Sequence, residues 1–173
     1  MMIRPATSAD LPAILGIYNE VIATTTAVFS ELPVTLENRQ TWWQERRAAG
    51  YPLLVAVATT PAAEGSGEGG TVLGFASFGD FRSWPGYRHT VEHSVHVLAT
   101  ARGRGVGSAL VNALFPHAAA LGKHVMVAGV DAANLGSLRM HERLGFERVA
   151  HFKEVGRKFD RWLDLVFLQR YVD

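Results

Sequence analysis

A glycine-rich turn between a predicted strand and a predicted helix constrains this chain more than any other feature. Residues 91–97 alternate between Val91, Val95 and Val97 and polar side chains, which is typical of a strand with two different faces. Beyond Val106, apolar residues recur at the spacing of a helix that buries one side. The turn between them reads Arg102-Gly103-Arg104-Gly105-Val106-Gly107. The fold therefore has to place a helix directly after a central strand.

This turn is suited to hold an anion. The first N–H groups of a helix have no partner within the helix, and the helix dipole gives this end about half a positive charge. Glycines let a ligand approach the backbone closely, and Arg102 and Arg104 add positive charge. A diphosphate would fit here, but a glycine-rich connection with two solvated arginines explains the same residues.

The spacing of the glycines excludes two common nucleotide-binding motifs. G-x-G-x-x-G is absent, because Ser108 and Leu110 stand where its last glycine is required. The Walker pattern is absent too, since the Gly122-Lys123 pair follows the predicted helix. The pattern that remains, Arg-x-x-Gly-x-Gly after a valine-rich strand, resembles the acetyl-CoA pyrophosphate loop of the GNAT superfamily of N-acetyltransferases.

Composition favours one globular domain that spans residues 1–173. Hydrophobic residues make up 48% of the chain and charged residues 19%, which is sufficient for a full core. The net charge of +1 argues against a nucleic-acid partner. The absence of cysteine excludes disulfides, thiolate metal sites and a cysteine nucleophile. Without an apolar signal core or a membrane-spanning run, we expect a cytoplasmic protein with no membrane partner.

The hydrophobic pattern along the chain predicts a mixed α/β sheet with helices on both faces. Strands are predicted at 2–5, 53–58, 71–79, 91–97, 124–131, 146–155 and 162–171, and helices at 11–22, 35–49, 106–121 and 135–144. The Thr7-Ser8-Ala9-Asp10 segment resembles a capping signal for the first helix. The low-complexity segment 60–70 is predicted to be a flexible hairpin loop. This order of elements matches the GNAT fold.

A second segment strengthens the resemblance. GNAT proteins carry an asparagine that faces the cofactor arm, a tyrosine seven residues later and a Leu-Gly-Phe ending. Asn134 holds the asparagine position here, and Leu144-Gly145-Phe146 forms the ending. His141 stands where the tyrosine is usual, and that tyrosine is commonly assigned as the acid that protonates the leaving thiolate. Histidine at this position is typical of the phosphinothricin and methionine sulfoximine acetyltransferases.

The resemblance to this branch covers nearly the whole chain and is weakest across 60–70. Further similar stretches lie at 78–82, 89–95, 124–130 and 155–165. His96 is a departure, because the branch usually has tyrosine there. The resemblance implies acetyl-CoA as co-substrate and an acceptor with an α-amino group, such as L-methionine sulfoximine, L-methionine sulfone or phosphinothricin. It also implies a homodimer, for which Trp42, Trp43 and Trp162 could form an interface or could equally be core.

Direct acetyl transfer to an amine needs a base. A lysine-like amine with a pKa of ~10.4 costs ~4–5 kcal/mol to deprotonate at pH 7. Glu92 is the candidate general base, since the branch places its catalytic glutamate there; an ion pair between Glu92 and Arg88 is the simpler alternative. His141 is the candidate acid or proton relay, or else a surface histidine beside Glu142.

The resemblance also implies a set of binding residues. The cofactor would be held by Val95, His96, Val97, Arg102, Gly103, Arg104, Gly105, Val106, Gly107, Ser108, Asn134 and Ser137. The acceptor would be held by Arg82, Ser83, Trp84, Glu92, His93 and Ser94. The aromatic residues Phe29, Phe81, Trp84 and Tyr87 could form the walls of its pocket, although core or subunit packing is the simpler explanation for each of them. In this set Arg82 could clamp a carboxylate, and the backbone N–H groups near Val95 to Val97 could stabilise negative charge on the thioester oxygen.

Three alternatives remain open at the level of the sequence. His89, His93 and His96 are close together, but no nearby Asp or Cys completes a metal site, so we expect no metal. A non-catalytic acetyl-CoA sensor would keep the glycine turn, yet Glu92 and His141 favour an enzyme. The acceptor could instead be a polyamine, an antibiotic amine or a protein N-terminus.

Overall fold

The computed structural model describes residues 1–59 and 70–172, which form one seven-stranded sheet and four α-helices. The strands are β1 (Met2–Pro5), β2 (Leu53–Val57), β3 (Val72–Asp80), β4 (Thr90–Val97), β5 (Val125–Asp131), β6 (Glu147–Lys158) and β7 (Arg161–Tyr171). The helices are α1 (Leu11–Thr24), α2 (Leu36–Ala48), α3 (Val106–Ala120) and α4 (Leu135–Arg143). The predicted order of elements is confirmed.

The sheet is mixed, as predicted. Its strand order is β1-β2-β3-β4-β5-β7-β6. Only β4 and β5 run parallel, and the other neighbours are antiparallel. Helix α3 is the crossover between the two parallel strands, as such a connection requires.

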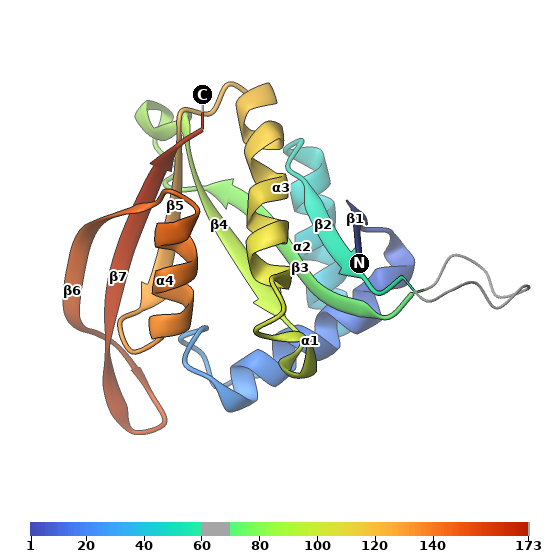
Figure 1. Ribbon diagram of the computed structural model, residues 1–173, viewed down its shortest axis with the longest axis horizontal. Helices are drawn as coiled ribbons and strands as arrows, with labels where there is room; N and C mark the ends of the chain where they lie inside the picture. Colours follow the sequence, from blue (N-terminus) through green and yellow to red (C-terminus); the bar gives the residue numbers. More distant parts are fainter. Residues whose placement is uncertain (60–69, 173) are drawn as a thin grey trace, which may run out of the picture.

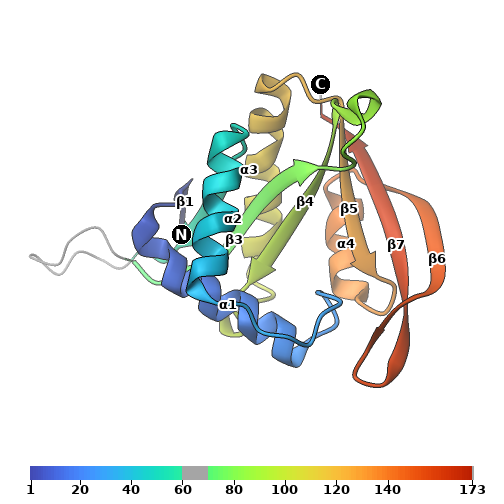
Figure 2. The ribbon, with the colours of Figure 1, turned by 180° about the vertical axis from the view of Figure 1, so that it is seen from behind.

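Helices cover both faces of the sheet (Figures 1 and 2). One core joins α3 and α4 to the sheet, with Leu110, Leu114 and Met126 fully buried. A second, smaller core places Ile14 of α1 against Phe75 of β3 on the opposite face. Residues of β4 therefore alternate between two different surroundings, and the central strand separates the two cores.

The C-terminal hairpin is longer than its sequence predicts. Strand β6 continues to Lys158 instead of ending at residue 155, and β7 begins at Arg161. Phe159 and Asp160 make the reversal, both with a positive φ, of 52° and 56°. Neither residue is the glycine that usually marks such a turn, so the sequence signal is weak. The predicted loop at 60–70 lies outside the described residues except for Gly70.

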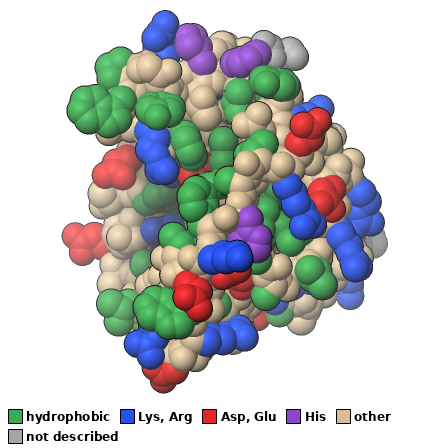
Figure 3. All heavy atoms as spheres, turned by 90° about the vertical axis from the view of Figure 1, so that its left-hand side faces the viewer, with side chains coloured by type: hydrophobic (Ala, Val, Ile, Leu, Met, Phe, Trp, Pro, Cys, Tyr) green, Lys and Arg blue, Asp and Glu red, His purple; other side chains and the backbone are tan. Residues whose placement is uncertain are grey.

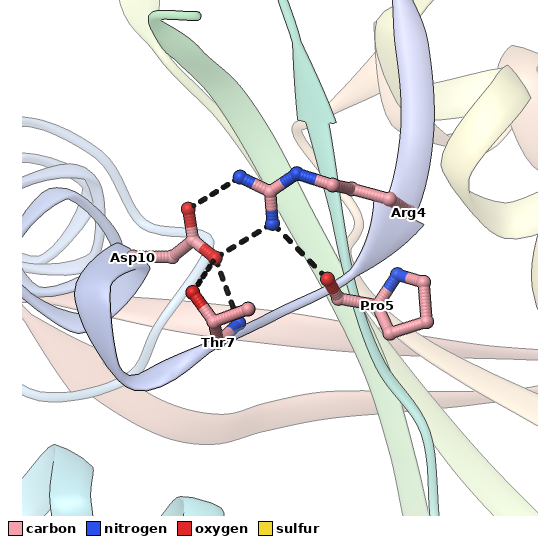
Figure 4. Close-up of polar contacts among 4 residues, drawn as sticks. All are labelled: Arg4, Pro5, Thr7 and Asp10. Carbon is pink, nitrogen blue, oxygen red and sulfur yellow. Dashed lines mark hydrogen bonds and ion pairs between the residues drawn. The ribbon is translucent and has the colours of Figure 1, made fainter. Parts of the chain in front are cut away.

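An ion pair at the start of α1 holds the helix to the first strand (Figure 4). Both guanidinium nitrogens of Arg4 donate to the carboxylate of Asp10 at 2.8 Å. The same carboxylate accepts from the backbone N–H and the hydroxyl of Thr7, at 2.7 and 3.0 Å. The segment predicted to cap the helix is a short 3₁₀ turn, Ser8–Asp10, that leads into α1 at Leu11.

The two parallel strands of the sheet part soon after they meet. Pairing between β4 and β5 is limited to Thr90–Val125, Val91–Met126 and Glu92–Val127. Beyond Glu92, the ribbons separate towards their C-terminal ends (Figure 1). This separation opens the middle of the sheet directly before the glycine-rich turn.

Candidate active site

A cleft of about 1070 Å³ lies where β4 and β5 separate. Its walls come from the end of β4, the glycine-rich turn, the start of α3, the end of β5, helix α4 and the end of α1. Eleven of the twelve predicted cofactor residues line this cleft: Val95, His96, Val97, Arg102, Gly103, Gly105, Val106, Gly107, Ser108, Asn134 and Ser137. Arg104 is not among the lining residues.

The glycine-rich turn requires glycine because of its backbone conformation. Gly103 and Gly105 have φ values of +74° and +79°, which side chains rarely tolerate, and a Cβ atom at either would meet no neighbour within 4 Å. Gly105 is the N-cap of α3, whose first helical hydrogen bond runs from Ala109 N to Gly105 O at 3.0 Å. The backbone N–H groups before Ala109 therefore precede the helical ladder at the cleft wall.

Two further residues shape the cleft through packing. A Cβ atom at Gly107 would lie 3.1 Å from Sδ of Met140, so this glycine allows α3 to approach α4 closely. The side chain of Asn134 caps α4, because its Oδ1 accepts from Ser137 N at 3.1 Å. Arg102 fixes the turn to the strand by donating from Nε to Val97 O at 3.1 Å.

These residues fit a ligand that carries a diphosphate. The N-terminus of a long helix, two glycines in the left-handed region and the Arg102 guanidinium converge on one large cleft. The gap between β4 and β5 offers unpaired strand edges to an extended arm of the same ligand. Acetyl-CoA combines both features.

Glu92 lies at the last residue pair before the strands separate. Its side chain is half-buried on the face of the sheet opposite to α3. Burial raises the pKa of the Glu92 carboxyl above its ordinary value, and the positive charge of Arg82 opposes that rise. Glu92 and Arg82 are therefore close enough for their charges to interact. Burial also gives Glu92 a greater affinity for protons than an exposed glutamate has.

An open, aromatic surface adjoins Glu92. Gly129 of β5 is exposed, and a Cβ atom there would lie 3.0 Å from Glu92 Oε1 and 3.3 Å from the ring of Phe167. The ring centroid of Phe167 lies 6.0 Å from that of Phe81 and 5.7 Å from that of Phe152. The guanidinium of Arg82 lies over Phe81, 4.5 Å from its centroid. A small amine that carries a carboxylate can therefore contact the Glu92 carboxyl group, the Arg82 guanidinium and the phenylalanine rings at this surface.

The other predicted acceptor residues lie in different places. Phe29 packs on Gly156 of β6, where a Cβ atom would lie 2.2 Å from the phenylalanine ring. Ser83 and Trp84 lie in the loop after β3, where Trp84 is 75% exposed. Ser94 pairs with Ser77 across β3 and β4.

His93 and His141 form a buried pair behind the cleft. His141 is only 2% exposed, and its Nε2 lies 3.1 Å from Nε2 of His93. Its Nδ1 lies 2.8 Å from Ser137 O, so the neutral ring carries its proton on Nδ1. Burial lowers the pKa of His141, and burial together with His141 lowers the pKa of His93 to about 3. Both rings are neutral at pH 7, which weighs against His141 as a proton donor.

His96 lies on the opposite face of β4 from this pair. Its ring contacts Tyr18 and Phe75, with both centroid distances at 5.2 Å. Burial, with the positive charges of Arg39 and Arg102, lowers the pKa of His96 to about 4. His96 therefore presents a neutral imidazole to the cleft.

Sequence reasoning missed the segment that joins α1 to α2. Thr24, Thr25, Thr26 and Ala27 line the cleft together with Asp131, Phe159 and Arg161. The hydroxyl of Thr26 donates to the carboxylate of Asp131, which is buried at the end of β5. The run of threonines at 24–26 was the available signal, because hydroxyls in a loop often fix it to a neighbour.

Neither a metal cluster nor a membrane span is found in the described part of the chain. Within 1–59 and 70–172, no group of three or more His, Asp and Glu side chains is arranged to hold a metal ion. No helix in these ranges is long and apolar enough to cross a bilayer.

Comparison with known proteins agrees with the geometry. Residues 14–146 match the model of the acetyltransferase (GNAT) family. The chain is 49% identical over 171 residues to L-methionine sulfoximine/L-methionine sulfone acetyltransferase of Pseudomonas aeruginosa, covering 99% of this chain and 94% of that protein. It is 46% identical to the L-amino acid N-acyltransferase MnaT of Escherichia coli, covering 100% and 95%.

A solved structure shows the same architecture with cofactor. The GNAT phosphinothricin acetyltransferase of Sinorhizobium meliloti, in complex with acetyl-CoA, superposes with a TM-score of 0.90 at 35% identity, covering 98% of this chain and 87% of that one. The cleft, the turn that precedes α3 and these relatives lead to one conclusion. The chain belongs to the GNAT family and is an acetyl-CoA-dependent N-acetyltransferase.

Proposed function

We propose that this enzyme acetylates the α-amino group of a small amino-acid-like acceptor by direct transfer, with Glu92 as general base. The observation that carries the proposal is the half-buried Glu92 carboxylate, which lies where β4 and β5 separate and beside the open position at Gly129. The names of the relatives support acceptors such as L-methionine sulfoximine, L-methionine sulfone and phosphinothricin.

Glu92 takes the proton that the attacking amine must lose. Burial raises its pKa, which increases its affinity for the proton that it takes. A base matched in this way can contribute about 10²- to 10⁴-fold to the rate. No cysteine is available for a covalent intermediate, which is consistent with direct transfer.

Arg82 and the aromatic side chains recognise the rest of the acceptor. The Arg82 guanidinium binds the α-carboxylate, and its position over Phe81 restricts its motion. Phe81, Phe152 and Phe167 then contact the apolar part of the acceptor side chain. Phe29, Ser83, Trp84, His93 and Ser94 remain predictions for acceptor binding.

The cofactor-binding residues orient the acetyl donor. Bound acetyl-CoA supplies an activated thioester. The N-terminus of α3 and Arg102 bind its diphosphate, and the edge of β4 from Val95 to Val97 binds its extended arm. Backbone N–H groups on that edge stabilise the negative charge that develops on the carbonyl oxygen. His141 remains a predicted acid, although its buried pairing with His93 favours a structural role.

The proposal extends to the assembly and location of the enzyme. We expect a homodimer, since the C-terminal hairpin carries exposed apolar side chains on Val149, Val155 and Trp162. We also expect the enzyme to be cytoplasmic. Figure 3 shows this side of the molecule, with apolar side chains gathered across its hollowed middle.

A thiol-release assay tests the acceptor class. The panel contains acetyl-CoA with methionine sulfone, methionine sulfoximine, phosphinothricin, plain amino acids, spermidine and an aminoglycoside. Turnover with the first three supports the proposal. Turnover confined to spermidine or the aminoglycoside contradicts the acceptor pocket and favours another amine. Acetyl-CoA binding without any turnover contradicts the enzymatic role and favours a sensor.

A further inference from the structure

The only lysine buried in the described part of the chain has no place in the mechanism above. Lys158 is the last residue of β6 and its side chain is 1% exposed. The turn at Phe159 and Asp160 follows it directly. A buried amino group is costly, because its charge loses solvation, and burial lowers the pKa of Lys158. Hydrogen bonds from the amino group offset this cost, and they fix the segments of the chain that accept them.

The partners of Lys158 belong to the end of α1 and to the loop that follows it. Its Nζ donates to Ile22 O at 2.6 Å and to Val28 O at 2.8 Å, across more than a hundred residues of chain. Ile22 is within the last turn of α1, where carbonyl groups lack helical partners and the dipole is negative. Lys158 therefore caps α1 and holds the loop after it at the same time.

The surrounding hairpin holds the same loop at two more points. Phe159 N donates to Glu31 Oε1 at 2.7 Å. The ring of Phe29 occupies the space beside Gly156 that any side chain there would need. Three contacts therefore join the tip of the β6–β7 hairpin to residues 28–31. The four residues just before them, 24–27, line the cleft beside Phe159 and Arg161.

We propose that Lys158 is a positioning residue for the acceptor. By fixing Ile22 O and Val28 O, it holds residues 24–27 as a wall of the cleft. It also keeps Phe29, a predicted acceptor residue directly after Val28, in its place against Gly156. Thr26 then keeps its bond to Asp131 at the end of β5. Loss of the amino group frees this wall, while the turn at 102–108 is untouched. This inference rests on the proposed acetyl transfer.

The test compares Lys158→Met with wild type and with Lys153→Met, a control at an exposed lysine of the same strand. Wild-type turnover of L-methionine sulfone is measured first, so that failure of the proposed function is seen separately. For Lys158→Met we expect the acceptor KM to rise about tenfold or more, as misplaced substrate contacts typically cause, with the acetyl-CoA Kd within twofold of wild type. Lys153→Met should match wild type in both.

A chemical rescue separates positioning from simple stability. The chain has no cysteine, so Lys158→Cys alkylated with 2-bromoethylamine while unfolded carries a single new ammonium group of nearly lysine length. After refolding beside wild type treated identically, the acceptor KM should return to within about threefold of wild type, because only the amino group was missing. A KM that stays raised would overturn the proposal.

Two other outcomes are also decisive. A lower melting temperature for Lys158→Met with an unchanged acceptor KM would show that the lysine only stabilises the fold. If Lys158→Met does not fold, Glu31→Ala decides, since Glu31 is exposed and its loss removes the bond to Phe159 N and the negative charge near Lys158 while leaving the amino group in place. A raised acceptor KM in that variant supports the wall, and an unchanged KM overturns it.

Discussion

At the scale of single residues, the proposed acceptor site depends on a glycine as much as on a carboxylate. Gly129 leaves open the space beside Glu92 Oε1 that a Cβ atom would occupy at 3.0 Å. Gly107 serves a different purpose, because it lets Met140 approach α3. Each glycine therefore sets how closely its neighbours approach, and Gly129 leaves room for the carboxylate of Glu92.

Glu92→Gln removes the proposed base and keeps its shape. We expect kcat to fall by about 10²-fold or more, with little change in the Kd of acetyl-CoA. The wild-type rate should fall as pH drops through the pKa of Glu92, which burial places above that of an ordinary glutamate. Stopped assays from pH 6 to 9 measure both, with exposed Glu147→Gln as control. Full activity of Glu92→Gln across this range would show that the base is another group.

Sequence reasoning proposed Glu92 and Arg82 but could not predict the contacts of Lys158 or the burial of His141. Glu92 and Arg82 followed from a family resemblance and lie close to each other in the fold. Lys158 depends on partners at Ile22 and Val28, which only the tertiary structure brings near. The sequence predicted His141 to be an acid or proton relay, or else a helix-surface histidine, whereas the structure buries it against His93, 48 positions away.

At the scale of elements, the turn before α3 was predictable because its signal is local. Three alternating glycines, two arginines and the start of a helical pattern fall within 102–107. The cleft wall at 24–27 was missed because its position depends on the distant hairpin. The end of β6 was predicted too early because Phe159 and Asp160 make the turn with positive φ, and no glycine marks that turn in the sequence.

Gly105→Val strains the turn and should abolish tight acetyl-CoA binding. A β-branched residue is disfavoured at a φ of +79°, so the turn shifts and its N–H groups no longer converge. Calorimetry should show acetyl-CoA binding at least about tenfold weaker, equivalent to about 1.4 kcal/mol. Gly122→Val is the matched control, with a φ of +65° just beyond the other end of α3. Equal loss of binding in both would mean that helix stability, and not the turn, is measured.

Asp10→Asn tests the ion pair that starts α1. Hydrogen bonds from Arg4, opposed by burial, lower the pKa of Asp10 from 3.8 to about 2. The ionised form therefore stabilises the fold above the unfolded pKa of about 3.9, and this contribution is lost as pH falls from about 4 to 2. At pH 7 the variant should lose about 1–2 kcal/mol of unfolding free energy in urea.

The pH dependence of that loss is the decisive observation. The difference between wild type and Asp10→Asn should shrink steadily as the buffer is taken from pH 5 towards pH 2.5. Asp160→Asn, whose side chain is 99% exposed, should cost little at any pH. A difference for Asp10→Asn that stays constant with pH would mean that the carboxylate charge is not what stabilises the helix start.

At the scale of the whole molecule, the tryptophans differ in how far they are exposed to solvent. Trp42 and Trp43 of α2 are partly buried against the second core. Trp162 is 60% exposed and lies on the hairpin with Val149 and Val155. Of the two roles that the sequence left open, core packing applies to Trp42 and Trp43, whereas the apolar side chains of the C-terminal hairpin are exposed.

The proposed homodimer should depend on this hairpin. Wild type should sediment at twice the chain mass of 18.9 kDa, and Val155→Glu should sediment as a monomer, because a buried unpaired carboxylate is costly. Leu121→Glu places the same charge on an exposed apolar residue at the end of α3 and should remain dimeric. A monomeric wild type, or a dimeric Val155→Glu, would contradict this interface.

The short pairing between β4 and β5 has a consequence for the enzyme when it is empty. Only three residue pairs join β1–β4 to β5–β7 across the sheet, and further along the two strands present unpaired backbone to each other. An unpaired strand edge invites pairing with foreign chains, and most proteins keep such edges at the periphery. Here the edge is internal, and acetyl-CoA bound as proposed would cover it. With that binding mode, we expect saturation with acetyl-CoA to protect the enzyme against aggregation as well as to supply substrate.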